Sequence, residues 1–192
     1  MKINILAFSG SSRRESFNKK LLAIAALGAE EGGANVTLID LADYPMPVFN
    51  QDLEDEKGIP KNALEFKRLL TNHDAFIIAS PEYNSSFSPL LKNVIDWASR
   101  TESDTEPPME AYQGKMAAIL AASPGALGGL RGLVCLRMLL SNLGVAVLPD
   151  QQTIPRADKA FNGDGLLIDD KKQNAVKALG RKLTLMAGKL KG

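Results

Sequence analysis

The chain has 192 residues, of which 45% are hydrophobic and 23% charged, so residues 1–192 can build the core of a single domain. The formal net charge of +1 gives no field that would attract nucleic acid or an acidic membrane, and no apolar run approaches the roughly 20 residues that cross a bilayer, so we expect a cytoplasmic protein. With one cysteine and one histidine, the chain can form no internal disulfide, no CxxC redox pair and no Cys/His zinc site, so any redox chemistry needs a bound cofactor.

Short apolar runs recur along the chain and predict five β-strands. The first, third and fourth runs are nearly continuous, as is typical of strands covered on both faces, and patterns with helical spacing lie between the runs. This alternation predicts an α/β fold, a doubly wound parallel sheet of order 2-1-3-4-5 with helices on both faces. Such sheets bind ligands beyond the carboxyl ends of strands 1 and 3, where the strand order reverses. The predicted strands are Ile3–Ala7, Asn35–Ile39, Ala75–Ala79, Met116–Ala121 and Val145–Leu148.

The segment from Phe8 to Asn18 follows the first predicted strand and leads into a helical pattern. The unpaired N–H groups of a helix N-terminus suit an anion, and Ser11, Ser16 and Arg13 add hydroxyl and charged donors. The segment has neither the Lys-Ser/Thr ending of a P-loop nor the glycine spacing of a dinucleotide fingerprint. It predicts a site for a phosphate monoester, with an ordinary serine N-cap as the alternative.

Two side chains further along the chain have alternative interpretations. His73 precedes the third predicted strand, and we expect it to cap the preceding helix rather than to serve a Ser-His-Asp triad. Trp97 lies on a helical pattern and belongs either to the core or, if it is exposed, to a subunit interface.

Two further loops follow the third and fourth predicted strands. The first, residues 80–89, has Tyr83 between Pro81 and Pro89 and offers an aromatic and peptide plane on which a planar ligand can stack. The second, residues 122–131, is rich in glycine and allows close approach of a flat ligand edge. Ordinary tight turns are the alternative for both loops. Since all three loops meet at one sheet edge, the sequence favours a phosphorylated flavin as the ligand.

Three motifs in these loops are shared with a known family. They read Gly-Ser-x-Arg-x-x-Ser-x-Asn, Pro-Glu-Tyr-Asn followed by Leu-Lys-Asn-x-x-Asp, and Ser-x-Gly-x-x-Gly-Gly-x-Arg. They correspond to Gly10–Asn18, to Pro81–Asn84 with Leu91–Asp96, and to Ser123–Arg131. In these motifs the chain resembles the NAD(P)H-dependent FMN reductases, a flavodoxin-like family that includes quinone, chromate and azo-dye reductases. The resemblance extends from Lys2 to about Leu148.

The resemblance implies a flavodoxin-like fold, FMN as cofactor and NADPH or NADH as reductant. It implies no catalytic side chain: a nicotinamide stacks on the flavin, transfers hydride and leaves, and a small-molecule acceptor then collects two electrons in its place. It also implies a homodimer or homotetramer, with the loop Glu102–Gly114 of one subunit bordering the flavin of its neighbour. The implied cofactor-binding residues are Ser11, Arg13, Ser16 and Asn18 at the phosphate, with Phe17 in the same segment, then Pro81, Glu82, Tyr83 and Asn84 along the ring, and Ser123 and Gly125 at the ring edge or ribityl chain.

Some alternatives remain open at the level of sequence. We expect Glu82 to be held for its backbone or for a structural pair rather than to carry a proton. Arg131 either meets a dinucleotide phosphate, is solvated, or pairs with a loop carboxylate. The alternative function is a flavodoxin-type electron carrier without NAD(P)H turnover, which the near-zero net charge and Arg13 disfavour. A flavin-binding module without turnover and the arsenical-resistance oxidoreductases, which the single cysteine weighs against, are further alternatives. The sequence does not decide between NADPH and NADH.

Overall fold

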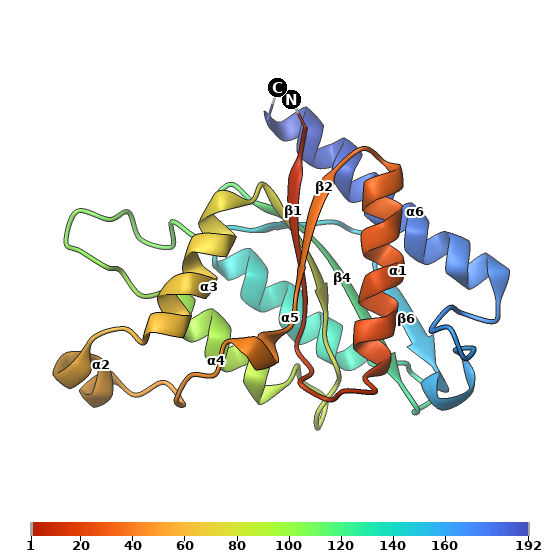
Figure 1. Cartoon of the computed structure of the whole chain (residues 1–192), viewed down its shortest axis with the longest axis horizontal. Coiled ribbons are helices and arrows are strands. Elements are labelled where there is room, and N and C mark those ends of the chain that lie inside the picture. Colours follow the sequence, from red (N-terminus) through yellow and green to blue (C-terminus); the bar gives the residue numbers. More distant parts are fainter. Residues whose placement is uncertain (1, 192) are drawn as a thin grey trace.

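The computed structural model describes residues 2–191, which form a parallel β-sheet between two layers of helices (Figure 1). The strands lie in the order β2-β1-β3-β4-β5, and β6 also pairs with β4. Every pairing is parallel, so the predicted doubly wound order is confirmed. The strands are β1 (Asn4–Ser9), β2 (Asn35–Ile39), β3 (Ala75–Ala79), β4 (Met116–Ser123), β5 (Ala146–Val147) and β6 (Gln152–Pro155).

The strands that pair with β4 on the side away from β3 differ from the prediction. The fifth predicted strand, Val145–Leu148, shortens to the two residues of β5, which pair with the start of β4. Pro149 has no N–H to offer β4, so the chain leaves the sheet there and returns as β6 along the second half of β4. No strand pattern predicts β6, because Ile154 is its one large apolar residue.

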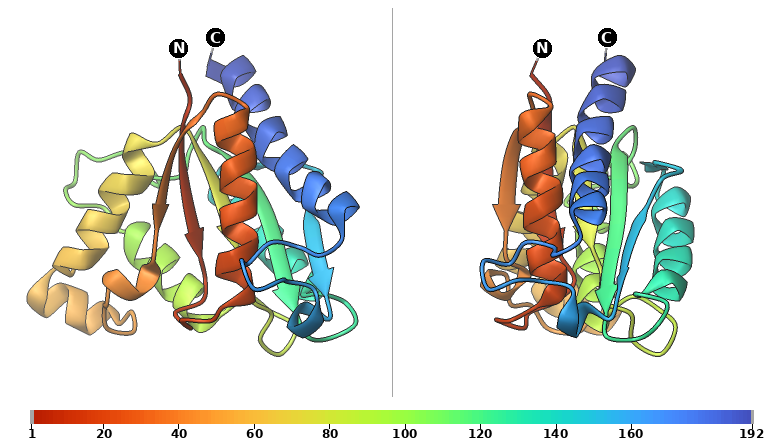
Figure 2. Two further views of the ribbon diagram at one scale, coloured as in Figure 1. Left: turned by 45° about the vertical axis from the view of Figure 1, so that its right-hand side comes forward. Right: turned by 90° about the vertical axis from the view of Figure 1, so that its right-hand side faces the viewer.

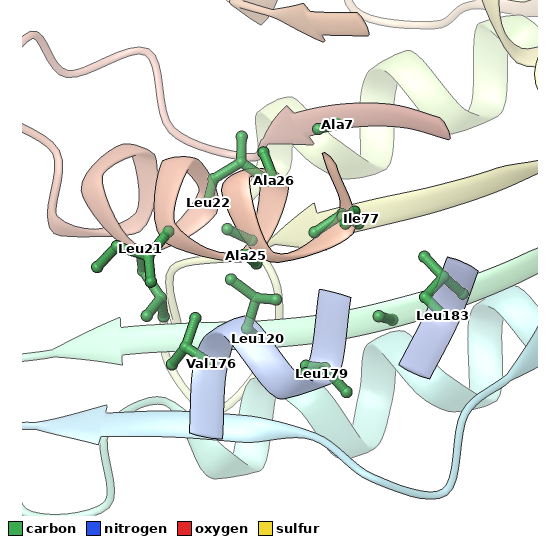
Figure 3. Packing of buried hydrophobic residues seen from close by; sticks show 14 of the residues in the cluster. Ala7, Leu21, Leu22, Ala25, Ala26, Ile77, Leu120, Val176, Leu179 and Leu183 are labelled. Carbon is green, nitrogen blue, oxygen red and sulfur yellow. The ribbon is translucent and has the colours of Figure 1, made fainter. Parts of the chain in front are cut away.

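Helices cover both faces of the sheet (Figure 2). One face carries α1 (Phe17–Glu31) and α6 (Asp170–Lys191), and the other carries α3 (Lys61–Asn72), α4 (Pro89–Ala98) and α5 (Leu130–Asn142). A buried apolar cluster fills each side: Leu21, Leu120 and Leu183 belong to the first (Figure 3), and Phe8 and Phe66 to the second. These clusters fix the starts of α1, α4 and α5 against the carboxyl ends of the strands. The short helix α2 (Gln51–Lys57), which the sequence pattern did not predict, lies in the connection from β2 to α3.

The two helices on the first face, α1 and α6, meet through glycine. A Cβ atom added at Gly28 would lie 2.1 Å from the carbonyl oxygen of Lys177, and one added at Gly180 would lie 2.1 Å from that of Ala25. Only glycine allows the two backbones to approach this closely. This contact holds α1 in place, and with it the loop that precedes the helix.

The structure decides both alternatives raised for His73 and Trp97. His73 ends α3, with its Nδ1 2.6 Å from the carbonyl oxygen of Leu69, so its expected capping role is confirmed. Trp97 is fully buried, and its Nε1 donates a hydrogen bond of 2.8 Å to the carbonyl oxygen of Pro47. Trp97 is therefore a core residue and not an exposed interface residue.

Candidate functional site

A hollow of about 140 Å³ lies at the carboxyl ends of β1, β3 and β4 and is open to solvent. It gathers the predicted binding residues except Asn84 and Gly125, and adds Ala122 and Pro124, which the sequence interpretation did not name. The structure thus brings the three predicted loops to one place. The lining residues are Ser11, Arg13, Ser16, Phe17, Asn18, Pro81, Glu82, Tyr83, Ala122, Ser123 and Pro124.

The loop after β1 presents a row of unpaired N–H groups. Within residues 2–191, the N–H groups of residues 11–15, 17 and 18 make no hydrogen bond of good geometry to the protein. Ser16 is the N-cap of α1, and its Oγ accepts a hydrogen bond of 3.3 Å from the N–H of Lys19. Its own O–H remains available as a donor. The serine N-cap and the anion-binding interpretation are therefore compatible, because the cap uses only one lone pair of the hydroxyl.

The cations around this loop differ in their pairing. Lys19 forms a salt bridge of 2.5 Å with Asp40. Burial raises the pKa of Asp40, but the hydrogen bonds from Lys19 and from the N–H of Ala42 outweigh it, and the pKa lies below its ordinary value. Arg13 forms no salt bridge with any of the residues described, and its guanidinium carbon lies 5.4 Å from the centroid of the Phe17 ring. Its charge is thus available to an anion at the loop.

Asn18 joins two of the three loops. Its Nδ2 donates to the carbonyl oxygen of Ala122 at 3.0 Å, and its Oδ1 accepts from the N–H of the same residue at 2.9 Å. Both bonds are buried, so the carboxamide clamps the first turn of α1 to the end of β4. We expect Asn18 to act by positioning the loops, with one N–H of its carboxamide left over for a ligand.

The loop after β3 contains a tight hairpin turn that displays an aromatic ring. Tyr83 and Ser86 exchange backbone hydrogen bonds of 2.8 and 3.1 Å, and the residues between them, Asn84 and Ser85, have φ values of 50° and 70°. Positive φ at both central positions is the mark of a type I′ turn, which asparagine accepts readily. The turn leaves the Tyr83 ring 53% exposed beside the hollow, where a flat ligand can stack on it.

Glu82 links this loop to the start of α5. Its carboxylate accepts hydrogen bonds from the N–H groups of Arg131 and Gly132 at 3.1 and 3.3 Å, and from Nε of Arg131 at 2.8 Å. The helix has no side-chain cap of its own, so Glu82 supplies one from a distant loop. Glu82 thus makes the expected structural pair, and its partner is Arg131, which pairs with this loop carboxylate.

The glycines of the loop after β4 have two different roles. A Cβ atom at Gly128 would lie 2.6 Å from the nitrogen of Pro155, and one at Gly129 would lie 2.6 Å from the Cβ of Ala121. These glycines allow close packing within the chain, not the approach of a ligand. At Gly125, by contrast, an added Cβ would meet only Ser123 Oγ, at 3.5 Å, so this position is not closed by packing within the chain.

The hollow suits a phosphorylated planar ligand. Ser9, the last residue of β1, has the one buried side-chain oxygen or nitrogen, within residues 2–191, that lacks a hydrogen-bond partner. With the free N–H groups and Arg13, the loop offers the donors that a phosphate of about −2 charge needs. Pockets that enclose a whole ligand of this kind measure roughly 300–1,000 Å³. The hollow is smaller, so part of the ligand would lie on the open surface beside Tyr83.

Neither a metal centre nor a membrane-spanning helix is found in the described part of the chain. No group of three or more His, Cys, Asp or Glu side chains within it could hold a metal ion. No helix within it is long and apolar enough to cross a membrane.

Comparisons with known proteins agree with this geometry. Residues 3–159 match the family model described as NADPH-dependent FMN reductase. The chain is 36% identical, over 99% of its length and 98% of the relative's, to an NAD(P)H-dependent FMN reductase of Pseudomonas aeruginosa. It is 34% identical, over 99% of its length and 91% of the relative's, to a probable NADPH:quinone oxidoreductase of Oryza sativa. Its structure resembles that of FerB, a flavoenzyme NAD(P)H:(acceptor) oxidoreductase of Paracoccus denitrificans, with a TM-score of 0.78 and 25% identity over 97% of this chain and 98% of the other.

Proposed function

The chain belongs to the NADPH-dependent FMN reductase family, and we propose on that premise that it passes two electrons from NAD(P)H through FMN to small-molecule acceptors. Quinones, free flavin, azo compounds and chromate are the acceptor classes, because the hollow is open to solvent and acceptors of different size and shape can reach it. The observation that carries the proposal is the convergence of unpaired N–H groups, a free arginine and an exposed tyrosine on one hollow. We further propose that residues 1–192 act as one FMN-binding domain in the cytoplasm.

The residues of the hollow fit the two ends of FMN. Ser11, Arg13 and Ser16 would hold the phosphate together with the N–H groups of their loop. Tyr83 would lie along the ring, and Ser123 and Gly125 at its edge or at the ribityl chain. Asn18 and Glu82 hold these groups in position. Asn18 is hydrogen-bonded to the end of β4, and Glu82 joins the Tyr83 loop to α5 by its hydrogen bonds.

When bound, FMN supplies the electron-transfer chemistry, taking a hydride from the nicotinamide and releasing two electrons to the acceptor. The protein has to bind, orient and expose the cofactor. No general acid or base is required of it, and the carboxylate nearest the hollow, Glu82, is fully engaged with Arg131 and the start of α5. We therefore assign no catalytic side chain.

The visible absorption spectrum of the purified protein tests this function directly. After loading with FMN, flavin bands that bleach promptly on anaerobic addition of NADPH are the expected result. Bands that persist would replace the proposal with a flavodoxin-type carrier or a binding module without turnover. A protein that takes up no flavin would overturn both.

Cys135 is expected to be dispensable for turnover. Its side chain, on α5, is partly exposed, and its Sγ donates a weak hydrogen bond of 3.6 Å to the carbonyl oxygen of Ser85. A weak sulfur contact of this kind contributes little, so Cys135→Ser should keep kcat/KM for NADPH within about twofold of wild type. Steady-state quinone reduction measures this. A tenfold or larger loss would mean that a thiol takes part in the reaction and that the flavin does not act alone.

We infer that the protein is a homodimer that associates through the exposed face of α5. Leu127, Leu130, Val134 and Met138 are 40–63% exposed and follow one another along this helix and the turn before it. A second copy of the chain would cover this apolar row and also border the open side of the hollow, because the Tyr83 loop packs on α5. The loop Glu102–Gly114 joins α4 to the start of β4, at the other end of the sheet from the hollow of its own chain.

The double change Val134→Lys and Met138→Lys should convert the dimer to a monomer. Light scattering coupled to size exclusion measures the mass, which should fall from twice the chain mass to the 20.7 kDa of one chain. Leu190→Lys is the matched control, since Leu190 is also about 60% exposed but lies on α6. A wild-type protein that is already monomeric, or a double variant that remains dimeric, would contradict the assignment of this face.

A further inference from the structure

A second hollow lies beside the loop that follows β4. Its volume is about 560 Å³, which falls within the range of sites that hold nucleotide-sized ligands, whereas the flavin hollow measures about 140 Å³. It is formed by the end of β6, by the short 3-10 helix η2 (Ala157–Lys159) and by the segment leading into α6. Its lining residues are Pro155, Arg156, Lys159, Ala160, Leu167, Ile168, Asp169 and Lys172.

The second hollow adjoins the flavin site on two sides. The N–H of Arg156 donates to the carbonyl oxygen of Gly125 at 3.4 Å, so the loop after β4, which lines the flavin hollow through Ser123 and Pro124, also contacts a residue that lines the second hollow. On the other side, Phe161 stacks on Phe17, with centroids 6.0 Å apart and planes 7° from parallel. Phe17 in turn lies under Arg13. Figure 2 shows the segment after β6 passing the lower end of α1.

The charge of the second hollow is unbalanced. Asp169 is the only carboxylate in its lining and lies 3.9 Å from Lys172. Arg156 and Lys159 form no salt bridge with any residue from 2 to 191. Two cations in the lining thus lack a carboxylate partner, and an anion of charge about −2 would neutralise them.

The floor of the hollow is apolar. Leu167 is buried beneath it, and the Ile168 side chain is 65% exposed. An apolar surface beside two free cations suits a nucleoside that carries a phosphate monoester. The base would lie on the aliphatic side chains, and the phosphate would bind the guanidinium group of Arg156.

We propose that this hollow binds the adenosine 2′-phosphate end of NADPH, with Arg156 and Lys159 on the 2′-phosphate. The inference rests on the proposed function, which supplies the dinucleotide, and it names the residues that make the enzyme prefer NADPH to NADH. The nicotinamide end would lie at the flavin hollow, and the loop after β4 would lie between the two ends. A 2′-phosphate is a monoester of charge about −2, whereas each phosphate of the pyrophosphate linkage carries about one charge, so the pair of free cations matches the 2′-phosphate better. An arginine is also the residue that accommodates this group in other dinucleotide sites.

Calorimetric titration with adenosine 2′,5′-bisphosphate and with 5′-AMP tests the site without any turnover. The FMN-loaded protein should bind the bisphosphate at least tenfold more tightly than 5′-AMP. Arg156→Asn, which suits the left-handed backbone at this position (φ 49°), should abolish that difference, and Lys159→Gln should reduce it. Lys171→Gln is the matched control, since this exposed lysine lies next to Lys172 but does not line the hollow. Equal binding of the two nucleotides to wild type, or a preference that both variants retain, would overturn the inference.

Steady-state kinetics give an independent readout. Arg156→Asn should raise the KM for NADPH about 10- to 100-fold and lower the preference for NADPH over NADH by the same factor, as expected for the loss of a charged hydrogen bond. A rise of equal size for both dinucleotides would place the pyrophosphate, not the 2′-phosphate, on Arg156 and would overturn the assignment. A protein that binds the bisphosphate but oxidises no NADPH would refute the proposed function and leave the anion site standing. A protein that oxidises NADPH but binds the bisphosphate no more tightly than 5′-AMP would refute the anion site and leave the proposed function standing.

Discussion

Gly180→Ala is expected to lower the free energy of unfolding by about 3 kcal/mol, at the upper end of the usual range for overpacking. The added Cβ would lie 2.1 Å from the carbonyl oxygen of Ala25 and 2.7 Å from the nitrogen of Ala29. Both atoms belong to the backbone of α1, so no side chain can turn aside, and α6 would have to move away from α1. Chemical denaturation followed by circular dichroism measures the change.

Gly188→Ala is the matched control for this prediction. Gly188 also lies within α6, but a Cβ added there would meet only Cγ1 of Ile3, at the ordinary contact distance of 3.8 Å. Alanine is favoured over glycine inside a helix by about 1 kcal/mol, so this variant should be as stable as wild type or more stable. If both variants changed stability alike, helix propensity and not the helix contact would be responsible, and the close packing of α1 on α6 would be refuted.

The helix contact also bears on the site. The start of α1 carries Ser16 and Asn18, and the side chain of Asn18 bonds to Ala122 at the end of β4. Movement of α1 would strain this clamp and separate two of the three loops. We therefore expect Gly180→Ala to weaken cofactor binding as well as folding, although the substitution lies in a helix that does not line the flavin hollow.

The sheet could be predicted because its central strands are covered on both faces. β1, β3 and β4 read as continuous apolar runs, and the alternation with helices fixed their order. The short length of β5 and the presence of β6 could not be predicted, because a partly exposed edge needs few apolar residues and the break at Pro149 depends on how two segments share β4. Strand propensity carries no information about such a division.

The binding loops could be predicted because their positions follow from strand order. The sequence could not show which polar groups already have hydrogen-bond or salt-bridge partners within the protein. Glu82 was expected to make a structural pair, but its partner, the start of α5, lies some 50 positions away along the chain. Gly128 was read as room for a ligand, whereas it makes room for β6. The second hollow was missed because Arg156 and Lys159 lie in an irregular segment, where no periodicity marks which side chains share a face.

Arg13→Ala should weaken FMN binding by about 1.5–3 kcal/mol, or roughly 10- to 150-fold in Kd, which is the usual effect of losing a charged hydrogen bond. Arg13 has no carboxylate partner within residues 2–191, and its Nη2 donates only to the exposed carbonyl oxygen of Glu15, so its removal takes charge from the phosphate site and leaves no buried partner behind. Riboflavin, which lacks the phosphate, should bind wild type and variant with nearly equal affinity. Arg68→Ala, an exposed arginine on α3, should change neither affinity. Fluorescence quenching of the two flavins gives all these Kd values.

The comparison of the two flavins separates a direct contact from an indirect one. Arg13 also lies over Phe17, which stacks on Phe161, so its loss could loosen the whole segment before α1. A loosened segment would weaken the binding of riboflavin as much as the binding of FMN. That result would contradict the assignment of Arg13 to the phosphate site. A loss confined to FMN means instead that the arginine acts on the phosphate itself. The N–H groups of the loop would then account for the affinity that remains, since no side-chain substitution removes them.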